Sequence, residues 1–193
     1  MIHDSASAAT APYVAWKNAF SAWEVDQIVA LCDQLALEKA KIAMGKDVVR
    51  PNIRISHTAR VPRDAQSEFL YAKVGQLAHM VNEKVYQFEL TGFSEAFQYT
   101  IYEGSEGGYY DWHIDHGGML QVIRKLSFSL QLSDPSEYEV GDLELYTSPQ
   151  IAKAPRERGT LIAFPSYSLH RVAPVTSGRR RSLVIWTQGP RFR

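Results

Sequence analysis

The densest group of potential metal ligands in this chain lies in the segment Tyr110-Asp-Trp-His113-Ile-Asp115-His116. Side chains alternate between the two faces of a β-strand, so a strand here places His113 and Asp115 on one face with Ile114 behind them. An imidazole and a carboxylate on one rigid face are suited to bind a single metal ion. The spacing therefore predicts two ligands of a metal site.

A third ligand has to come from a distant part of the chain, and His170 is the candidate. It stands 55 positions after Asp115 (170 − 115 = 55), at the start of a late predicted strand. Two imidazoles and one carboxylate on one face of an octahedron leave three positions open, which is the arrangement of non-haem Fe(II) oxygenases. Calcium or magnesium would need more oxygen ligands. The H-E-x-x-H motif of zinc hydrolases is absent from the sequence.

Other imidazoles and carboxylates compete for these positions. Asp111 shares the expected face of the first two ligands and His116 follows them directly, but both lie at the edges of the predicted strand. His3 and His57 are expected at the surface. His57 lies in a segment that contains four arginines: Arg50, Arg54, Arg60 and Arg63. This segment could bind an anionic substrate, although solvent exposure of the arginines is the simpler interpretation.

Three consecutive arginines, Arg179 to Arg181, begin the last predicted strand. We expect Ser177-Gly178 to form a hairpin turn that places this strand beside the one carrying His170. Alternation then directs Arg180 toward the metal pocket and its two neighbours toward solvent. A guanidinium is permanently charged and matches a carboxylate with two parallel hydrogen bonds, so Arg180 is the candidate for binding an organic acid.

The elements that must position these residues differ between the two halves of the chain. Ser21 and Glu24 form an S-x-x-E capping box, and the apolar spacing that follows predicts a helix to about Lys41. A second helix is expected after Pro62-Arg-Asp64, with its stop at Thr91-Gly92. The second half has short β-branched and aromatic stretches between turn residues, which predict strands near residues 96–102, 109–115, 124–132, 142–147, 159–164, 168–174 and 180–188.

Length and composition limit the class of protein. The 193 residues are 45% hydrophobic and 22% charged, as in a globular domain, and an Ala/Ser/Thr-rich stretch at residues 1–12 is expected to be a mobile tail. The 21 basic and 21 acidic residues cancel, which argues against a nucleic-acid partner. The single cysteine, Cys32, excludes an internal disulfide and a cysteine-based metal cage. Without an apolar run of membrane-spanning length or a secretory leader pattern, we expect no membrane partner and a cytoplasmic location.

These motifs together resemble the Fe(II)/2-oxoglutarate-dependent dioxygenases, and most closely their prolyl 4-hydroxylase-like branch. The shared pattern is H-x-D, then a distal histidine, then a basic residue ten positions later (180 − 170 = 10). The resemblance covers about residues 50–190. Val140-Gly141 is a departure, because the family usually has paired glycines there. The segments that carry the resemblance are Ile53-Arg-Ile-Ser56, Tyr109 to Asp115, Leu130 to Leu143, and His170 to Val175 with Arg180 and Trp186.

The resemblance implies a mainly β (α+β) fold, a double-stranded β-helix or jelly roll with N-terminal supporting helices. We expect residues 13–193 to form one dioxygenase domain. Its helical front would span residues 13–92 and its jelly-roll core residues 93–190.

The resemblance also implies the cofactors: Fe(II) on His113, Asp115 and His170, 2-oxoglutarate and O₂ as cosubstrates, and ascorbate as a reductant. Arg180 would pair with the distal carboxylate of 2-oxoglutarate. The remaining cosubstrate-binding candidates are Tyr102 and Gln98, which alternation places on one face, with Gln131 as a weaker pocket-lining candidate. Ordinary core packing is the alternative interpretation of Tyr102.

The implied function is hydroxylation of an unactivated C–H bond, in a prolyl or other amino-acid residue of a peptide or protein. One alternative is hydroxylation, desaturation or cyclisation of a free amino acid or small metabolite at the same centre. Another is a non-catalytic jelly-roll protein that binds a metal or ligand. Arg180 argues against the last, because a plain metal site needs no buried carboxylate-binding group.

Overall fold

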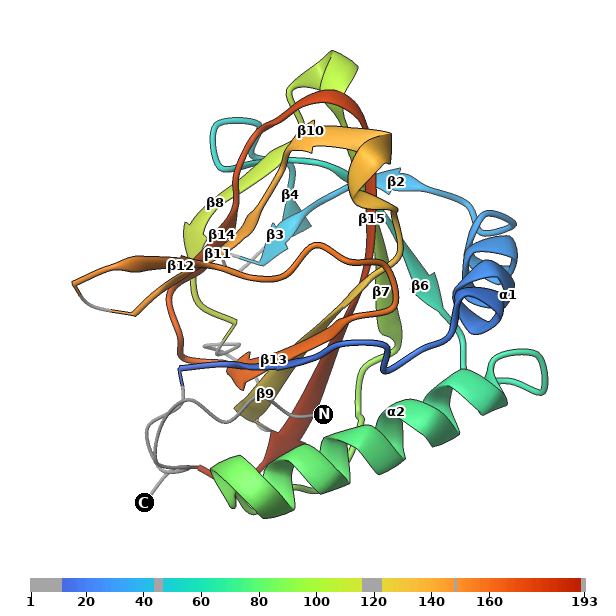
Figure 1. Cartoon of the computed structure of the whole chain (residues 1–193), viewed down its shortest axis with the longest axis vertical. Coiled ribbons are helices and arrows are strands. Elements are labelled where there is room, and N and C mark those ends of the chain that lie inside the picture. The colour runs from blue at the N-terminus through green and yellow to red at the C-terminus, as the bar shows by residue number, and fades with distance from the viewer. Residues whose placement is uncertain (1–11, 44–46, 116–122, 148, 192–193) are drawn as a thin grey trace.

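The computed structural model describes residues 12–43, 47–115, 123–147 and 149–191 (Figure 1). His3, His116 and all of the expected tail except Pro12 lie outside these residues. The helical elements are α1 (Ala22–Cys32), α2 (Glu68–Val81), a π-helical turn η1 (Asn82–Tyr86), and the 3-10 turns η2 (Gly104–Glu106) and η3 (Pro135–Glu137). Among the described residues, no helix combines the length and the apolar character of a membrane span.

The strands account for more of the described chain than the helices do. They are β1 (Val14–Trp16), β2 (Glu38–Lys39), β3 (Ile42–Ala43), β4 (Asp47–Val48), β5 (Arg54–Ile55), β6 (His57–Val61), β7 (Phe97–Glu103), β8 (Tyr109–His113), β9 (Ile123–Gln131), β10 (Tyr138–Val140), β11 (Leu143–Tyr146), β12 (Ile151–Lys153), β13 (Leu161–Pro165), β14 (His170–Val172) and β15 (Val175–Gly189).

Two antiparallel sheets face each other across the molecule (Figure 1). The large sheet has the order β1-β13-β9-β15-β7-β6-β2, with β10 also paired to β15, and the small sheet has the order β12-β11-β14-β8-β5. Phe164 of the large sheet and Leu145 and Val172 of the small sheet pack in one apolar cluster between them. This arrangement confirms the expected jelly roll.

The two α-helices back the large sheet on its outer face (Figure 1). Ile28 of α1 and Leu70 of α2 are fully buried in the same cluster as Phe128 and Leu183 of the sheet. Burying a side chain of this kind contributes about 1.5–3 kcal/mol. The helices therefore hold rigid the sheet whose inner face lines the site.

The expected capping box opens α1. The Ser21 hydroxyl accepts a hydrogen bond from the Glu24 backbone N–H (3.3 Å), and the Glu24 carboxylate accepts one from the Ser21 N–H (2.8 Å). The helix nevertheless ends at Cys32, well before the expected Lys41. The residues that follow form β2, which pairs with the edge strand β6. An open strand edge offers the backbone an alternative partner that local apolar spacing does not reveal.

The stretch 13–92 is likewise not helical throughout, since it contributes β1, β2, β5 and β6 to the two sheets. In the second half, the strands predicted near 96–102, 124–132 and 180–188 correspond to β7, β9 and β15. In this chain, period-two alternation therefore predicts strands more dependably than apolar spacing predicts the extent of helices. The short edge strands were missed because their pairing depends on distant partners.

The expected hairpin at Ser177-Gly178 is wrong. β15 runs through both residues and pairs with β7 and β9 of the large sheet, whereas the strand that carries His170 lies in the small sheet. Gly178 instead permits a close approach of chains: its φ is +71°, and a Cβ would lie 2.0 Å from the Glu137 carbonyl oxygen. Arg180 therefore reaches the interior from the sheet opposite His170.

Val140, at the departure from the paired-glycine pattern, has a left-handed backbone with φ of +59°. A β-branched residue in this region costs roughly 1–2 kcal/mol. We expect Val140→Gly to raise the free energy of unfolding by about 0.5–1 kcal/mol. The relieved backbone strain exceeds the extra conformational entropy that glycine loses on folding. Urea denaturation measures this, and Val140→Ala should give a smaller change. A less stable glycine variant would show that contacts of the Val140 side chain outweigh its backbone strain.

Candidate metal centre

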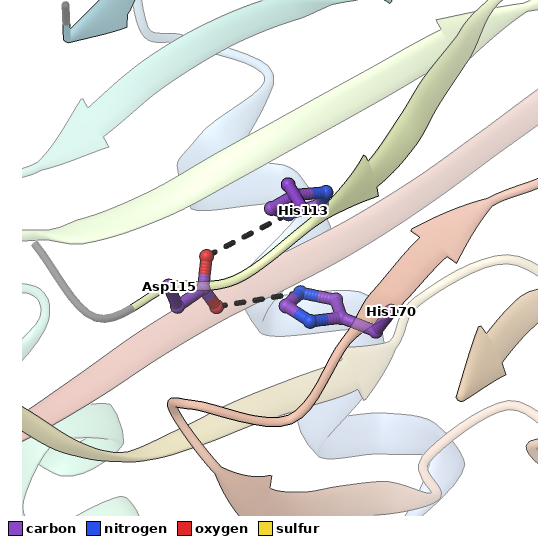
Figure 2. A group of neighbouring side chains, drawn as sticks. All are labelled: His113, Asp115 and His170. Carbon is purple, nitrogen blue, oxygen red and sulfur yellow. Dashed lines mark ion pairs between the residues drawn. The ribbon is translucent and has the colours of Figure 1, made fainter. Parts of the chain in front are cut away.

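The structure brings His113, Asp115 and His170 together (Figure 2). One potential ligand atom from each residue lies within 4.8 Å of the others. His113 ends β8 and His170 begins β14, and these two residues are direct partners in the antiparallel register. The pairing of β8 with β14 thus explains how a histidine so far along the chain reaches the H-x-D segment.

The Asp115 carboxylate lies to one side of the two imidazoles and directs one oxygen toward each, as Figure 2 shows. Its Oδ1 is 3.6 Å from Nε2 of His113, and its Oδ2 is 3.5 Å from Nε2 of His170. Two ligands that are each about 2.1 Å from one metal ion, at right angles, are about 3 Å apart. The three side chains are therefore close to the spacing of ligands on one ion.

Backbone carbonyls orient both imidazoles. Nδ1 of His113 lies 2.7 Å from the carbonyl oxygen of Asp111, and Nδ1 of His170 lies 2.9 Å from that of Ser168. A carbonyl oxygen only accepts, so each Nδ1 is the donor. Burial lowers the pKa of His113 to about 4, and the neighbouring His170 adds to this shift. The His113 ring is therefore neutral at pH 7 and leaves the Nε2 lone pair for a metal.

Asp115 is held by a buried network. Its backbone N–H donates to the Ser166 carbonyl oxygen (2.8 Å), and its Oδ2 accepts from Trp186 Nε1 (2.9 Å) and from the Ser127 hydroxyl (2.8 Å). Burial opposes ionisation, but the two imidazoles and the hydrogen bond from Trp186 bring the pKa of Asp115 well below its usual range. The site thus holds one anionic and two imidazole ligands.

The hydrogen bond from Trp186 to Asp115 is a contact that the sequence did not predict. We expect Trp186→Phe to weaken Mn(II) binding about 10- to 100-fold, because a donor that orients a metal-binding carboxylate typically contributes that much. The phenyl ring keeps the position against the Arg124 guanidinium, which lies 3.8 Å from the tryptophan ring centre. Calorimetric titration measures the affinity, and Trp112→Phe on β8 is the matched control. Unchanged affinity in Trp186→Phe would mean that Ser127 alone orients the carboxylate.

A bulge in β8 changes which side chains accompany His113. The register against β14 shifts between His113, opposite His170, and Tyr110, opposite Val172. The extra residue reverses the alternation. Asp111 is exposed as a result, and Tyr110 stacks on the His113 ring with centroids 3.5 Å apart. The expectation that Asp111 shares the ligand face is therefore wrong.

Arg180 lies on the inner face of the large sheet and is only 1% exposed. Its Nη2 donates to Gln131 Oε1 (3.0 Å), while its buried Nε has no hydrogen-bond partner among the described residues. Arg179 and Arg181 turn outward and pair with glutamates, as the alternation predicts. A buried guanidinium with an unused donor is costly unless an anion binds there.

Tyr102 and Gln98 lie on the same inner face. The register pairs Tyr102 directly with Arg180, whose guanidinium is 5.5 Å from the Tyr102 ring centre. Gln98 is buried and donates to the Thr100 hydroxyl (3.1 Å). Tyr102 also packs in the apolar cluster between the sheets, so it combines core packing with a position next to Arg180.

Comparison with known sequences places these observations among metal-dependent oxygenases. Residues 97–188 match the 2OG-Fe(II) oxygenase superfamily. The PKHD-type hydroxylase PiuC of Pseudomonas aeruginosa is 33% identical over 181 residues, which cover 88% of this chain and 75% of that protein. A PKHD-type hydroxylase of Prochlorococcus marinus is 42% identical over 86 residues, 45% of this chain and 39% of that protein.

Solved structures share the fold at lower identity. A prolyl-4-hydroxylase of Pseudomonas putida is similar with a TM-score of 0.74 and 20% identity, covering 93% of this chain and 94% of that one. A prolyl hydroxylase of Trichoplax adhaerens, in complex with a hypoxia inducible factor peptide fragment, has a TM-score of 0.76 and 21% identity, covering 92% and 83%. Both have the two-sheet fold described above.

Proposed function

The chain belongs to the 2OG-Fe(II) oxygenase superfamily, in its prolyl 4-hydroxylase-like branch, and we propose that it hydroxylates an amino-acid residue within a peptide or protein. It is an enzyme that depends on Fe(II) and 2-oxoglutarate. The observation that carries the proposal is the group of His113, Asp115 and His170, together with the buried Arg180 guanidinium, whose Nε has no hydrogen-bond partner among the described residues.

The donor set fits Fe(II). Two imidazole nitrogens and one carboxylate, with positions left open, are the ligands of non-haem Fe(II) oxygenases. In the proposal, His113 and His170 bind through Nε2, and Asp115 binds through its carboxylate. When bound, iron supplies the oxidation of 2-oxoglutarate by O₂ to succinate and CO₂, and the insertion of one oxygen atom into a C–H bond.

The interior of the large sheet fits the cosubstrate. Arg180 would pair with the distal carboxylate of 2-oxoglutarate through its unused donors, while Gln131 keeps the guanidinium in place. Tyr102, directly opposite Arg180 in the register, would contact the same carboxylate, and Gln98, on the same face of β7, would line the pocket.

Aromatic rings pack against both imidazoles. Tyr110 stacks on His113, and the Phe164 ring centre lies 4.6 Å from that of His170. A site that excludes water protects reactive intermediates from side reactions. These rings leave the Nε2 sides of the imidazoles facing Asp115.

A peptide substrate is supported by one likeness: the Trichoplax adhaerens prolyl hydroxylase, whose fold this chain shares, is solved with a peptide fragment. The test incubates the purified protein with Fe(II), 2-oxoglutarate, ascorbate and ¹⁸O₂, separately with a peptide pool and a metabolite pool. We expect one ¹⁸O atom in a peptide product and one succinate per product. Product only in the metabolite pool would overturn the peptide assignment, and loss of two hydrogens without oxygen would overturn hydroxylation.

A further inference from the structure

A second buried arginine lies beside the metal centre. Of the four arginines between residues 50 and 63, Arg50 is exposed at a turn and Arg63 pairs on the surface with Glu68. Arg54, by contrast, is only 7% exposed. Solvation, the simpler sequence interpretation, is therefore wrong for Arg54.

Sheet pairing carries Arg54 to the metal ligands. β5 pairs with β8 so that Arg54 stands opposite Tyr110, and its guanidinium carbon lies 4.5 Å from the Tyr110 ring centre. The same Tyr110 ring stacks on His113. Arg54 Nε donates to the Ser56 hydroxyl (2.7 Å). In the part of the chain that the structure describes, neither Nη nitrogen of Arg54 has a hydrogen-bond or ion-pair partner.

Most other arginines of the described chain have a carboxylate neighbour. The ion pairs are Arg63–Glu68, Arg124–Glu95, Arg156–Asp142, Arg158–Asp26, Arg171–Glu144, Arg179–Glu103 and Arg181–Glu137. Arg54 and Arg180 are the described arginines that are buried, and neither has a carboxylate neighbour among the described residues. Arg180 has a buried Nε without a partner, whereas the Nη nitrogens of Arg54 are not among the buried unpartnered atoms and are therefore open to an anion from outside the described chain.

The proposed cosubstrate accounts for only one of these positions. Its distal carboxylate is assigned to Arg180, which projects from the large sheet. Arg54 projects from the small sheet and lies against Tyr110, whose ring stacks on His113, so an anion held by its guanidinium would lie near the metal ligands. We infer that Arg54 binds a carboxylate of the primary substrate, so that the enzyme selects an acidic substrate.

This inference rests on the proposed function and narrows its substrate class. Two sources of the carboxylate fit the same guanidinium: an acidic side chain next to the oxidised residue of a peptide, or the α-carboxylate of the oxidised amino acid. Bidentate pairing of a guanidinium with a carboxylate contributes about 1.5–3 kcal/mol, which corresponds to a roughly 10- to 100-fold difference in affinity.

Two pairs of probes test this on protein loaded with Mn(II) and 2-oxoglutarate under nitrogen, so that binding is measured without turnover. The first pair is N-acetyl-L-proline and N-acetyl-L-prolinamide, and the second is acetyl-Asp-Pro-amide and acetyl-Asn-Pro-amide. Calorimetry should give at least tenfold tighter binding of one carboxylate probe than of its amide twin. The pair that shows the difference identifies the source of the carboxylate. If neither pair differs in the unmodified protein, the inference is overturned without reference to any variant.

Variants assign the preference to Arg54. We expect Arg54→Gln to reduce the carboxylate preference to under threefold, and Arg54→Lys, which keeps the charge but not the planar fork, to retain part of it. Arg63→Gln is the matched control on the same segment and should keep the full preference. A full preference in Arg54→Gln would overturn the inference. Equal weakening of 2-oxoglutarate binding by Arg54→Gln would also overturn it, by assigning Arg54 to the cosubstrate. The succinate assay is independent of these binding data, so failure here is distinct from failure of the proposed function.

Discussion

Replacing His170 by alanine is expected to reduce 2-oxoglutarate turnover to below about 1% of the unmodified protein, since loss of a neighbour that only orients a metal ligand already costs 10- to 100-fold. His170 Nε2 lies 3.5 Å from the Asp115 carboxylate, so its removal takes away one of the three grouped ligands. His113→Ala and Asp115→Ala should have effects of the same size. Succinate formation and Mn(II) affinity are the two measurements.

Controls separate loss of a ligand from loss of fold. His79→Ala changes an exposed histidine on α2 and should leave both measurements unchanged. Circular dichroism of the His170 variant should retain the strand-rich spectrum, because His170 is a member of neither apolar cluster of the large sheet. Near-normal turnover in the His170 variant would show that the ligand assignment is wrong.

Replacing Arg180 by methionine is expected to raise the KM for 2-oxoglutarate roughly 10- to 100-fold, because a hydrogen bond to a charged group contributes about 1.5–3 kcal/mol. Arg180 is buried on the inner face of the large sheet, and its Nε has no partner among the described residues. Succinate formation against 2-oxoglutarate concentration gives the KM.

The ligand-free Arg180→Met protein should be at least as stable as the unmodified one, since the substitution removes a buried unpaired charge. The increase of melting temperature caused by 2-oxoglutarate should be largely lost. Arg179→Met and Arg181→Met are matched controls, because both side chains turn outward to glutamates. Equal KM effects at all three positions would contradict the assignment of the distal carboxylate to Arg180.

The identity of the grouped residues followed from the sequence because it depends on local backbone periodicity. Alternation along one strand directs Arg180 inward and its neighbours outward, and it places Gln98 and Tyr102 on a common face. The same rule failed for Asp111, where one bulge residue in β8 reversed the faces. A bulge belongs to a pair of strands, so no single-strand pattern predicts it.

The start of α1 was predictable from the sequence, but its end was not. The capping box that starts α1 joins residues three positions apart and was predictable from them. The end of α1 at Cys32 was not, because the following residues pair with β6. Propensity therefore located where a helix begins, and competition for backbone partners decided where it stops.

The sequence by itself predicted which side chains the structure groups, two histidines and one aspartate, and predicted that Arg180 points inward from another strand. Only the tertiary structure decided their neighbours. The pairing of β8 with β14 brings His170 to His113, the β5–β8 pairing buries Arg54 beside them, and packing of the two sheets directs Trp186 to Asp115. Alternation is set by steric rules that act within a few residues. These contacts, by contrast, form only when distant segments close long loops, and burial of the whole core has to offset the entropy lost in closing them.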